Sequence, residues 1–155
     1  MEKYKLTDKT IVVDTITLHQ IQALIDIPSA NVKAGDLGGY VETEYNLSQD
    51  GTSWIHDRAI ASEDAVIMGN AQLYDRAYVT GQAIVWGNAI VRENATVHGH
   101  ATVFDNSKIS GTSIIHGRAI IHGNASISGN TTILGEVNIG KDTNISGNAR
   151  IYSCG

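Results

Sequence analysis

Residues 83–106 read AIVWGN-AIVREN-ATVHGH-ATVFDN, which is four consecutive hexads of one pattern. Each hexad begins with alanine, has valine two residues later, and has glycine, glutamate or aspartate two residues after that. Working outward from this stretch, the same register runs without an insertion from residue 53 to residue 154. An uninterrupted short repeat predicts a solenoid, in which each repeat packs on its neighbours.

The columns of the repeat predict how each coil is built. Sixteen of the seventeen residues at every sixth position from Ser53 are small, and sixteen of the seventeen two residues further on are Val, Ile or Leu. Residues two apart on a strand point to one side, so both columns face inward. Ten of the sixteen next positions are glycine, which favours a corner with positive φ. Three strands and three corners close a coil of eighteen residues, and asparagines recur at that spacing. They predict an asparagine ladder at one corner: Asn70, Asn88, Asn106 and Asn124.

This pattern resembles the hexapeptide repeat of left-handed β-helix proteins. The resemblance implies left-handed winding, which periodicity alone does not define. We therefore expect an all-β fold, a single-stranded left-handed parallel β-helix of about six coils with a small β-rich N-terminal cap. The expected division is a cap segment at residues 1–40 and the β-helix at residues 41–155.

The N-terminal third lacks the strict repeat and is expected to cover the open end of the solenoid, whose strand edges would otherwise be exposed. Residues 4–6 and 11–13 are typical of short strands around a polar turn, and residues 15–18 alternate like a strand although a helical stripe also fits residues 18–25. We favour the strand. The glycines at positions 35, 38 and 39 indicate a tight bend into the first coil, since no helix follows to make them a phosphate loop.

A second resemblance rests on particular residues before and at the start of the repeat. They are Val32-Lys33-Ala34-Gly35, the step Gly38-Gly39-Tyr40-Val41, Leu47-Ser48-Gln49 and Trp54-Ile55. In this order they resemble the lead-in segment of YdcK-like hexapeptide-repeat proteins of bacteria, phages and prophages. Members of that group are mostly described as transferases on the strength of the repeat, so the resemblance implies a fold more firmly than a chemistry.

Composition excludes several functional classes. The chain has 155 residues, of which 42% are hydrophobic and 17% charged, and its net charge is −5. This charge argues against general nucleic-acid binding, which requires a basic face. Residues 1–14 lack the apolar core of a signal peptide, and no run reaches the ~20 apolar residues of a membrane span. We expect no membrane association and a cytoplasmic protein. Cys154 alone cannot form a disulfide within the chain and is expected to be inert.

One of the three outer faces predicts self-association. Apolar and aromatic residues would be stacked on it over four coils, and monomers rarely expose so large an apolar area. Hexapeptide-repeat proteins often form trimers, so we expect a homotrimer with this stripe as its interface; coverage by the N-terminal segment or by a partner protein is the alternative. The expected interface residues are Val66, Met68, Ile84, Trp86, Phe104, Ile120 and His122.

Histidines are the candidates for chemistry. His98 and His116 lie eighteen residues apart and would be stacked, and the resemblance to hexapeptide acyltransferases implies a histidine base beside an acyl-CoA cleft. The other interpretations are ligand contact or two solvated side chains. The first of the three outer faces is the one that begins with the hexad at Ser53. Its candidate binding set, called the first-face set below, comprises Trp54, His56, Tyr74 and Arg92. No metal site is expected, because two histidines without carboxylates or thiolates ligate a metal poorly.

These observations leave three functional hypotheses. The first is a non-catalytic, oligomeric β-helix of a phage or prophage, which needs no cofactor. It would bind a host protein, in a counter-defence role, or a small anionic ligand. The alternative is an acyltransferase using acyl-CoA, although the repeat has no loop excursion to build an acceptor pocket and ends on its last coil. The third is a structural spacer or phage-particle component.

Overall fold

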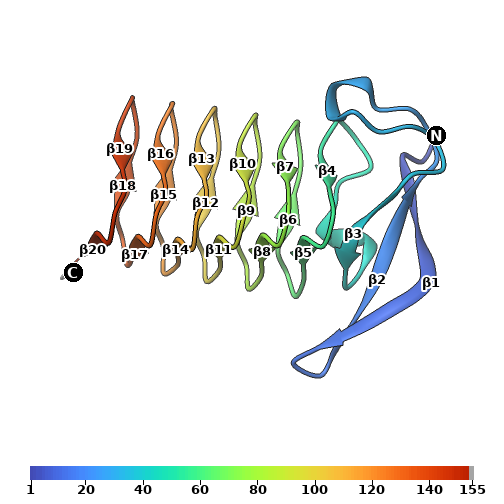
Figure 1. Cartoon of the computed structure of the whole chain (residues 1–155), viewed down its shortest axis with the longest axis horizontal. Helices are drawn as coiled ribbons and strands as arrows, with labels where there is room; N and C mark the ends of the chain where they lie inside the picture. Colours follow the sequence, from blue (N-terminus) through green and yellow to red (C-terminus); the bar gives the residue numbers. More distant parts are fainter. Residues whose placement is uncertain (154–155) are drawn as a thin grey trace.

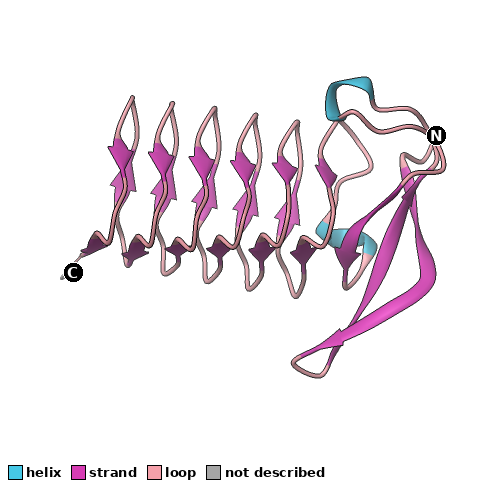
Figure 2. Ribbon diagram, in the orientation of Figure 1, coloured by secondary structure: helices cyan, strands magenta, loops and turns pink. Residues whose placement is uncertain are grey.

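The computed structural model describes residues 1–153 and is an all-β solenoid of about six coils (Figure 1). Each coil contributes one short strand to each of three parallel sheets, as Figure 2 shows. The first sheet continues β3 (Leu37–Val41) with β5 (Ile60–Ala61), β8 (Tyr78–Val79), β11 (Thr96–Val97), β14 (Ile114–Ile115), β17 (Thr132–Leu134) and β20 (Arg150–Tyr152). The second contains β4 (Trp54–Ile55), β7 (Gln72–Leu73), β10 (Ile90–Val91), β13 (Lys108–Ile109), β16 (Ser126–Ile127) and β19 (Asn144–Ile145). The third contains β6 (Val66–Ile67), β9 (Ile84–Val85), β12 (Thr102–Val103), β15 (Ile120–Ile121) and β18 (Asn138–Ile139). The predicted parallel β-solenoid is confirmed.

The register between coils is eighteen residues, as the hexads predict. Ile90 of β10 pairs with Gln72 of β7 on one side and with Lys108 of β13 on the other. The same offset holds on the third sheet, where Thr102 lies between Ile84 and Ile120. Columns of the repeat therefore become columns of stacked side chains, inside and outside the solenoid.

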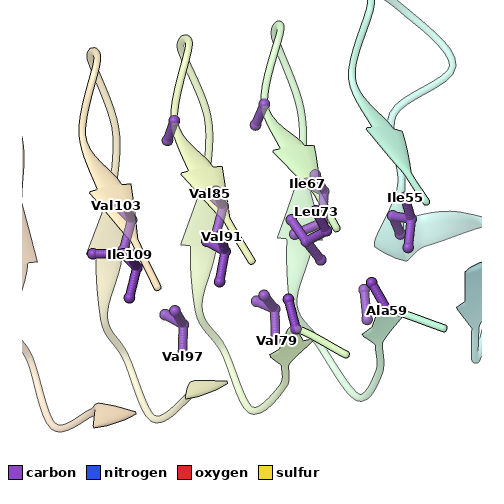
Figure 3. Close-up of a cluster of buried hydrophobic side chains, with 14 of the residues drawn as sticks. Ile55, Ala59, Ile67, Leu73, Val79, Val85, Val91, Val97, Val103 and Ile109 are labelled. Carbon is purple, nitrogen blue, oxygen red and sulfur yellow. The ribbon is translucent and has the colours of Figure 1, made fainter. Parts of the chain in front are cut away.

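The core is a stack of small and aliphatic side chains, shown in Figure 3. From Ile55 to Ile133, the inward aliphatic column has no exposed surface. The column of small residues from Ser53 to Thr131 lies beside it and is equally buried, so the two columns fill an interior that has no room for larger residues. Burial declines in the last coil, where Ile145 and Ile151 are only half-buried.

All sixteen corner positions from Asp57 to Gly147 have positive φ, including the six that are not glycine. Five of these six carry carboxylates, which at a turn are usually solvated. In the structure four of the five accept a hydrogen bond from a backbone N–H of the next coil; Asp57 Oδ2, for example, accepts one from Asp75 N at 3.0 Å. The equivalent acceptors are Asp75, Glu93 and Asp105. These bonds offset the cost of the left-handed backbone and join successive coils.

The predicted asparagine ladder is confirmed at another corner. The side-chain amide of Asn70 donates to the Oδ1 of Asn88 at 3.1 Å, and the same bond repeats at each coil up to Asn124. The ladder is longer than predicted, because Thr52 donates to Asn70 at one end and Asn124 donates to Asp142 at the other.

The N-terminal segment begins with a long hairpin of β1 (Tyr4–Val13) and β2 (Ile16–Ala23). The prediction of two short strands on either side of a polar turn is wrong, because the single strand β1 runs through the polar residues with an irregularity between Leu6 and Thr10. The favoured strand at β2 is confirmed. Short 3₁₀ helices follow at η1 (Pro28–Ala30) and η2 (Glu44–Asn46). Figure 1 shows the hairpin as an arm that leaves the N-terminal end of the solenoid.

Residues of the N-terminal segment cover the first coil. β2 pairs antiparallel with β3, and β3 pairs parallel with β5, so the arm extends the first sheet. Lys3 is 1% exposed and donates from Nζ to the backbone oxygen of Ser53 at 2.8 Å. The ring of Tyr4 meets that of Trp54 edge to face, with centroids 6.3 Å apart. The expected covering of the open end by this segment is therefore seen at the first coil.

Gly38 and Gly39 have a different role from the predicted bend. A Cβ at Gly38 would lie 2.6 Å from the backbone oxygen of Ile55, and one at Gly39 would lie 2.4 Å from that of Ala59. Both glycines therefore allow β3 to approach the first coil closely. Only Gly35, with φ of 95°, has the backbone of a turn.

Candidate functional site

His98 and His116 follow β11 and β14 on the outer side of the first sheet. Parallel pairing of these strands places the two rings one above the other, with centroids 4.6 Å apart and planes 5° from parallel. Both side chains are half-buried. The predicted stacking of this pair is confirmed, whereas its catalytic role stays a prediction.

Burial lowers the pKa of His98 below its usual value of 6.5, and the neighbouring His116 lowers it further. Two imidazolium rings at this spacing would repel each other, so the pair favours at least one neutral ring. A neutral imidazole near pH 7 has a free nitrogen lone pair and can accept a proton. The pair is therefore chemically suited to a general base.

The outward column of the first sheet that contains the pair is polar at its N-terminal end and apolar at its C-terminal end. Towards the N-terminus, Ser62 Oγ donates to Thr80 Oγ1 at 2.9 Å. Towards the C-terminus, the side chain of Leu134 is 38% exposed. Within residues 1–153, neither ring of the pair has a side-chain hydrogen bond or a carboxylate partner. Both rings can therefore face a ligand.

The outer face of the third sheet carries the predicted apolar stripe. The rings of Trp86 and Phe104 are stacked at 4.9 Å, and those of Phe104 and His122 at 5.4 Å. Met68, Trp86 and Ile120 are 37–39% exposed, and the other residues of the stripe are half-buried. His122 ends the stripe and contacts Asn138 Oδ1 through Nε2 at 2.7 Å. The structure thus places the seven expected interface residues on one face.

The first-face set is brought together only in part. His56 is stacked on Tyr74 at 4.3 Å, and its Nε2 lies 2.8 Å from Gln72 Oε1. Burial lowers the pKa of His56 despite this hydrogen bond. Arg92 is exposed on the next coil. Trp54 was expected on the outer surface, but it is 1% exposed because the N-terminal segment covers it. It is a core residue, and a ligand cannot reach it here.

Sequence reasoning missed a hollow of about 390 Å³ between the arm and the first coils. We name it the arm hollow, and its lining residues are Ile11, Tyr40, Arg58, Ile60 and Arg76. The repeat alone predicts that the two arginines, eighteen residues apart, occupy the same corner on successive coils. It does not predict that Ile11 lies beside them, because the position of Ile11 depends on where the arm lies.

Within residues 1–153, no group of three or more His, Cys, Asp or Glu side chains is arranged to hold a metal ion. No helix in that part combines the length and apolar character needed to cross a bilayer. Cys154, which the sequence predicted to be inert, lies outside the described residues.

With the fold and the repeat described, the chain can be compared with known proteins. No family model matches it. The chain is 36% identical over 81 residues to a protein of Escherichia coli (strain K12) described as the uncharacterized acetyltransferase YdcK; the match covers 46% of this chain. The chain spans only about a quarter, 24%, of that protein's length. The solenoid and this partial match fit a hexapeptide-repeat, transferase-like class and support left-handed winding.

Proposed function

We propose that the chain is a hexapeptide-repeat acyltransferase that uses an acyl-CoA donor, with His98 as its general base. The observation that carries the proposal is the half-buried, stacked pair of His98 and His116, in which burial and the second ring keep His98 neutral. The similarity to a protein described as an acetyltransferase supports the same reaction class. It favours this function over the non-catalytic alternative.

The proposed step is a direct acyl transfer. A hydroxyl or amino group of the acceptor attacks the thioester carbonyl while the His98 imidazole takes the proton of that group. The carbon–sulfur bond then breaks, and coenzyme A leaves as a thiolate that regains a proton. His116 acts as the stacked neighbour that disfavours protonation of His98 before the acceptor binds.

Self-association belongs to the same proposal. The stripe of seven residues on the third sheet is the contact surface, and a homotrimer is the assembly. Stacked aromatic rings and a methionine are the side chains that interface cores favour, and isolated monomers rarely expose them in one patch. An acyl-CoA cleft would then lie between subunits, next to outer faces such as the one that carries the histidine pair.

Replacing His98 with glutamine should lower the rate of coenzyme A release from acetyl-CoA by about 10²-fold or more, as expected when a general base is lost. The release of free thiol is measured with a panel of amino sugars and amino acids as acceptors. Because the pKa of His98 is lowered, the acidic limb of the wild-type rate profile should lie below pH 6.5.

His100→Gln is the matched control, since His100 is an exposed histidine at a nearby corner without a stacked partner. Its rate should equal that of the wild type. Equal rates for the His98→Gln and His100→Gln variants would contradict the assignment of the base.

A second candidate is a non-catalytic protein that assembles and binds a host protein, in a phage or prophage setting, or a small anion. The specific observation in its favour is the uniform coil: through residues 53–153 no loop excursion interrupts the repeat to form an acceptor pocket. Assembly without any acyl-CoA binding is the result that favours this candidate.

A further inference from the structure

The arm hollow lies where the arm overhangs the first two repeats of the solenoid. Ile11 comes from β1, Tyr40 from β3 and Ile60 from β5, so three neighbouring parts of the first sheet form its walls. Arg58 and Arg76 occupy the same corner position on successive coils, two residues before β5 and β8. The arm in Figure 1 slants back beneath the first coils, which agrees with this lining.

Positive charge in this corner column is confined to the coils beside the arm. The column continues along the solenoid with uncharged residues only: Asn94, Thr112, Asn130 and Asn148. The structure of the corner does not require arginine, because these four residues occupy the same position. Coil formation therefore does not explain why the two arginines occur only in the coils beside the arm.

Within residues 1–153, neither guanidinium lies within ion-pair distance of a carboxylate. The ion pair there that involves an arginine joins Arg118 to Glu136. Asp57 and Asp75 are the carboxylates next to the two arginines in sequence, and one oxygen of each accepts a hydrogen bond from the backbone of the following coil. Two guanidinium groups that line one hollow repel each other, and an anion bound between them would relieve that repulsion. Their planar forks also match the oxygen spacing of a carboxylate or phosphate.

The rest of the lining is apolar. Ile11 and Ile60 are half-buried, and Tyr40 is 8% exposed, so a ligand here would cover aliphatic and aromatic surface as well as meet the two cations. A volume of about 390 Å³ is in the range of small-molecule sites. A bare inorganic anion would leave the apolar walls uncovered.

We propose that the arm hollow binds a small organic anion, in which a carboxylate or phosphate group is attached to a compact apolar body. Arg58 and Arg76 hold the anionic group, and Ile11, Tyr40 and Ile60 hold the apolar body. This inference is independent of the proposed acyl transfer, because it uses none of the residues of the histidine pair.

The test is a titration of the ¹⁵N-labelled full chain, followed by the shifts of its backbone amide signals in NMR spectra. The probes are phenyl phosphate and benzoate, with inorganic phosphate for comparison. We expect saturable shifts at residues of the hollow with at least one organic probe, and weaker binding of inorganic phosphate. The tighter of the two organic probes identifies the preferred anionic group.

Arg58→Gln and Arg76→Gln should each weaken binding of the tighter probe by about tenfold or more, because each removes one charged fork. Arg118→Gln is the matched control and should bind like the wild type, since Arg118 is an exposed arginine on the same solenoid that pairs with Glu136. Ile11→Ser should weaken binding of the organic probe and leave that of inorganic phosphate unchanged. Shifts scattered over the surface, or unchanged affinity in the Arg58→Gln/Arg76→Gln double variant, would overturn the proposal.

Discussion

Val103→Asp is expected to leave the protein unfolded at room temperature. Val103 has no exposed surface and lies in the inward column between Val85 and Ile121. Aspartate there loses about 1.5–3 kcal/mol of apolar burial. It also buries a carboxyl group without a partner, at a cost of several kcal/mol more. The sum approaches the whole stability of a typical domain, about 5–15 kcal/mol.

Circular dichroism during thermal unfolding measures this effect. Lys108→Asp is the control, because Lys108 is an exposed outward residue on β13, the next strand along the chain, and should tolerate a carboxylate. We expect the control to melt close to the wild type and the Val103→Asp variant to show no cooperative transition. A folded Val103→Asp protein would refute the inward orientation of this column.

Trp86→Glu should dissociate the proposed trimer without unfolding the solenoid. Trp86 is 39% exposed and is stacked on Phe104 near the middle of the stripe. Three glutamates brought together at an apolar contact would each have to lose water without gaining a partner. Light scattering on a sizing column should give about three times the chain mass for the wild type and the chain mass for the variant.

Leu134→Glu is the control for this experiment. Leu134 is 38% exposed, almost the same as Trp86, but it lies on the first sheet. The same substitution there should leave the assembly intact. If the Trp86→Glu variant keeps the wild-type mass, the interface lies on another face; if the wild type is a monomer, the stripe is not a self-association surface.

The solenoid could be predicted from the sequence because the same contacts recur at a fixed spacing of eighteen residues. Once Ala89 and Val91 are assigned to an inward face, every residue six positions away has the same assignment, and the eighteen-residue coil follows. The asparagine ladder and the stacking of His98 on His116 are consequences of that one spacing. The sequence could therefore place outward side chains in columns without any further information.

The N-terminal segment could not be predicted in the same way. Nothing periodic relates Tyr4 to Trp54, and the covering of Trp54 depends on where the arm returns to the first coil. The arm hollow was missed for the same reason, since its arginines are in the repeat and Ile11 is not. The lowering of the pKa of His98 could not be predicted either, because it depends on how deeply the ring is buried. The position of His98 in the repeat does not give that depth.

The hydrogen bonds of the corner carboxylates could not be predicted from the repeat. Asp57 and Asp75 were recognisable as corner residues, and polar side chains at turns are usually solvated. Stacking of coils places the backbone N–H of the next corner within reach of each carboxylate, which the repeat length alone does not reveal. A column of acidic residues at eighteen-residue spacing is therefore a signal of bonding between coils.

Binding of acetyl-CoA to the wild-type protein tests the central claim most directly. Isothermal titration with acetyl-CoA, repeated in the presence of excess coenzyme A, separates specific binding from a general attraction to the anionic ligand. The proposed acyltransferase predicts saturable binding that coenzyme A competes away. No detectable binding at millimolar acetyl-CoA would contradict the claim and leave a solenoid that acts by assembly and recognition alone.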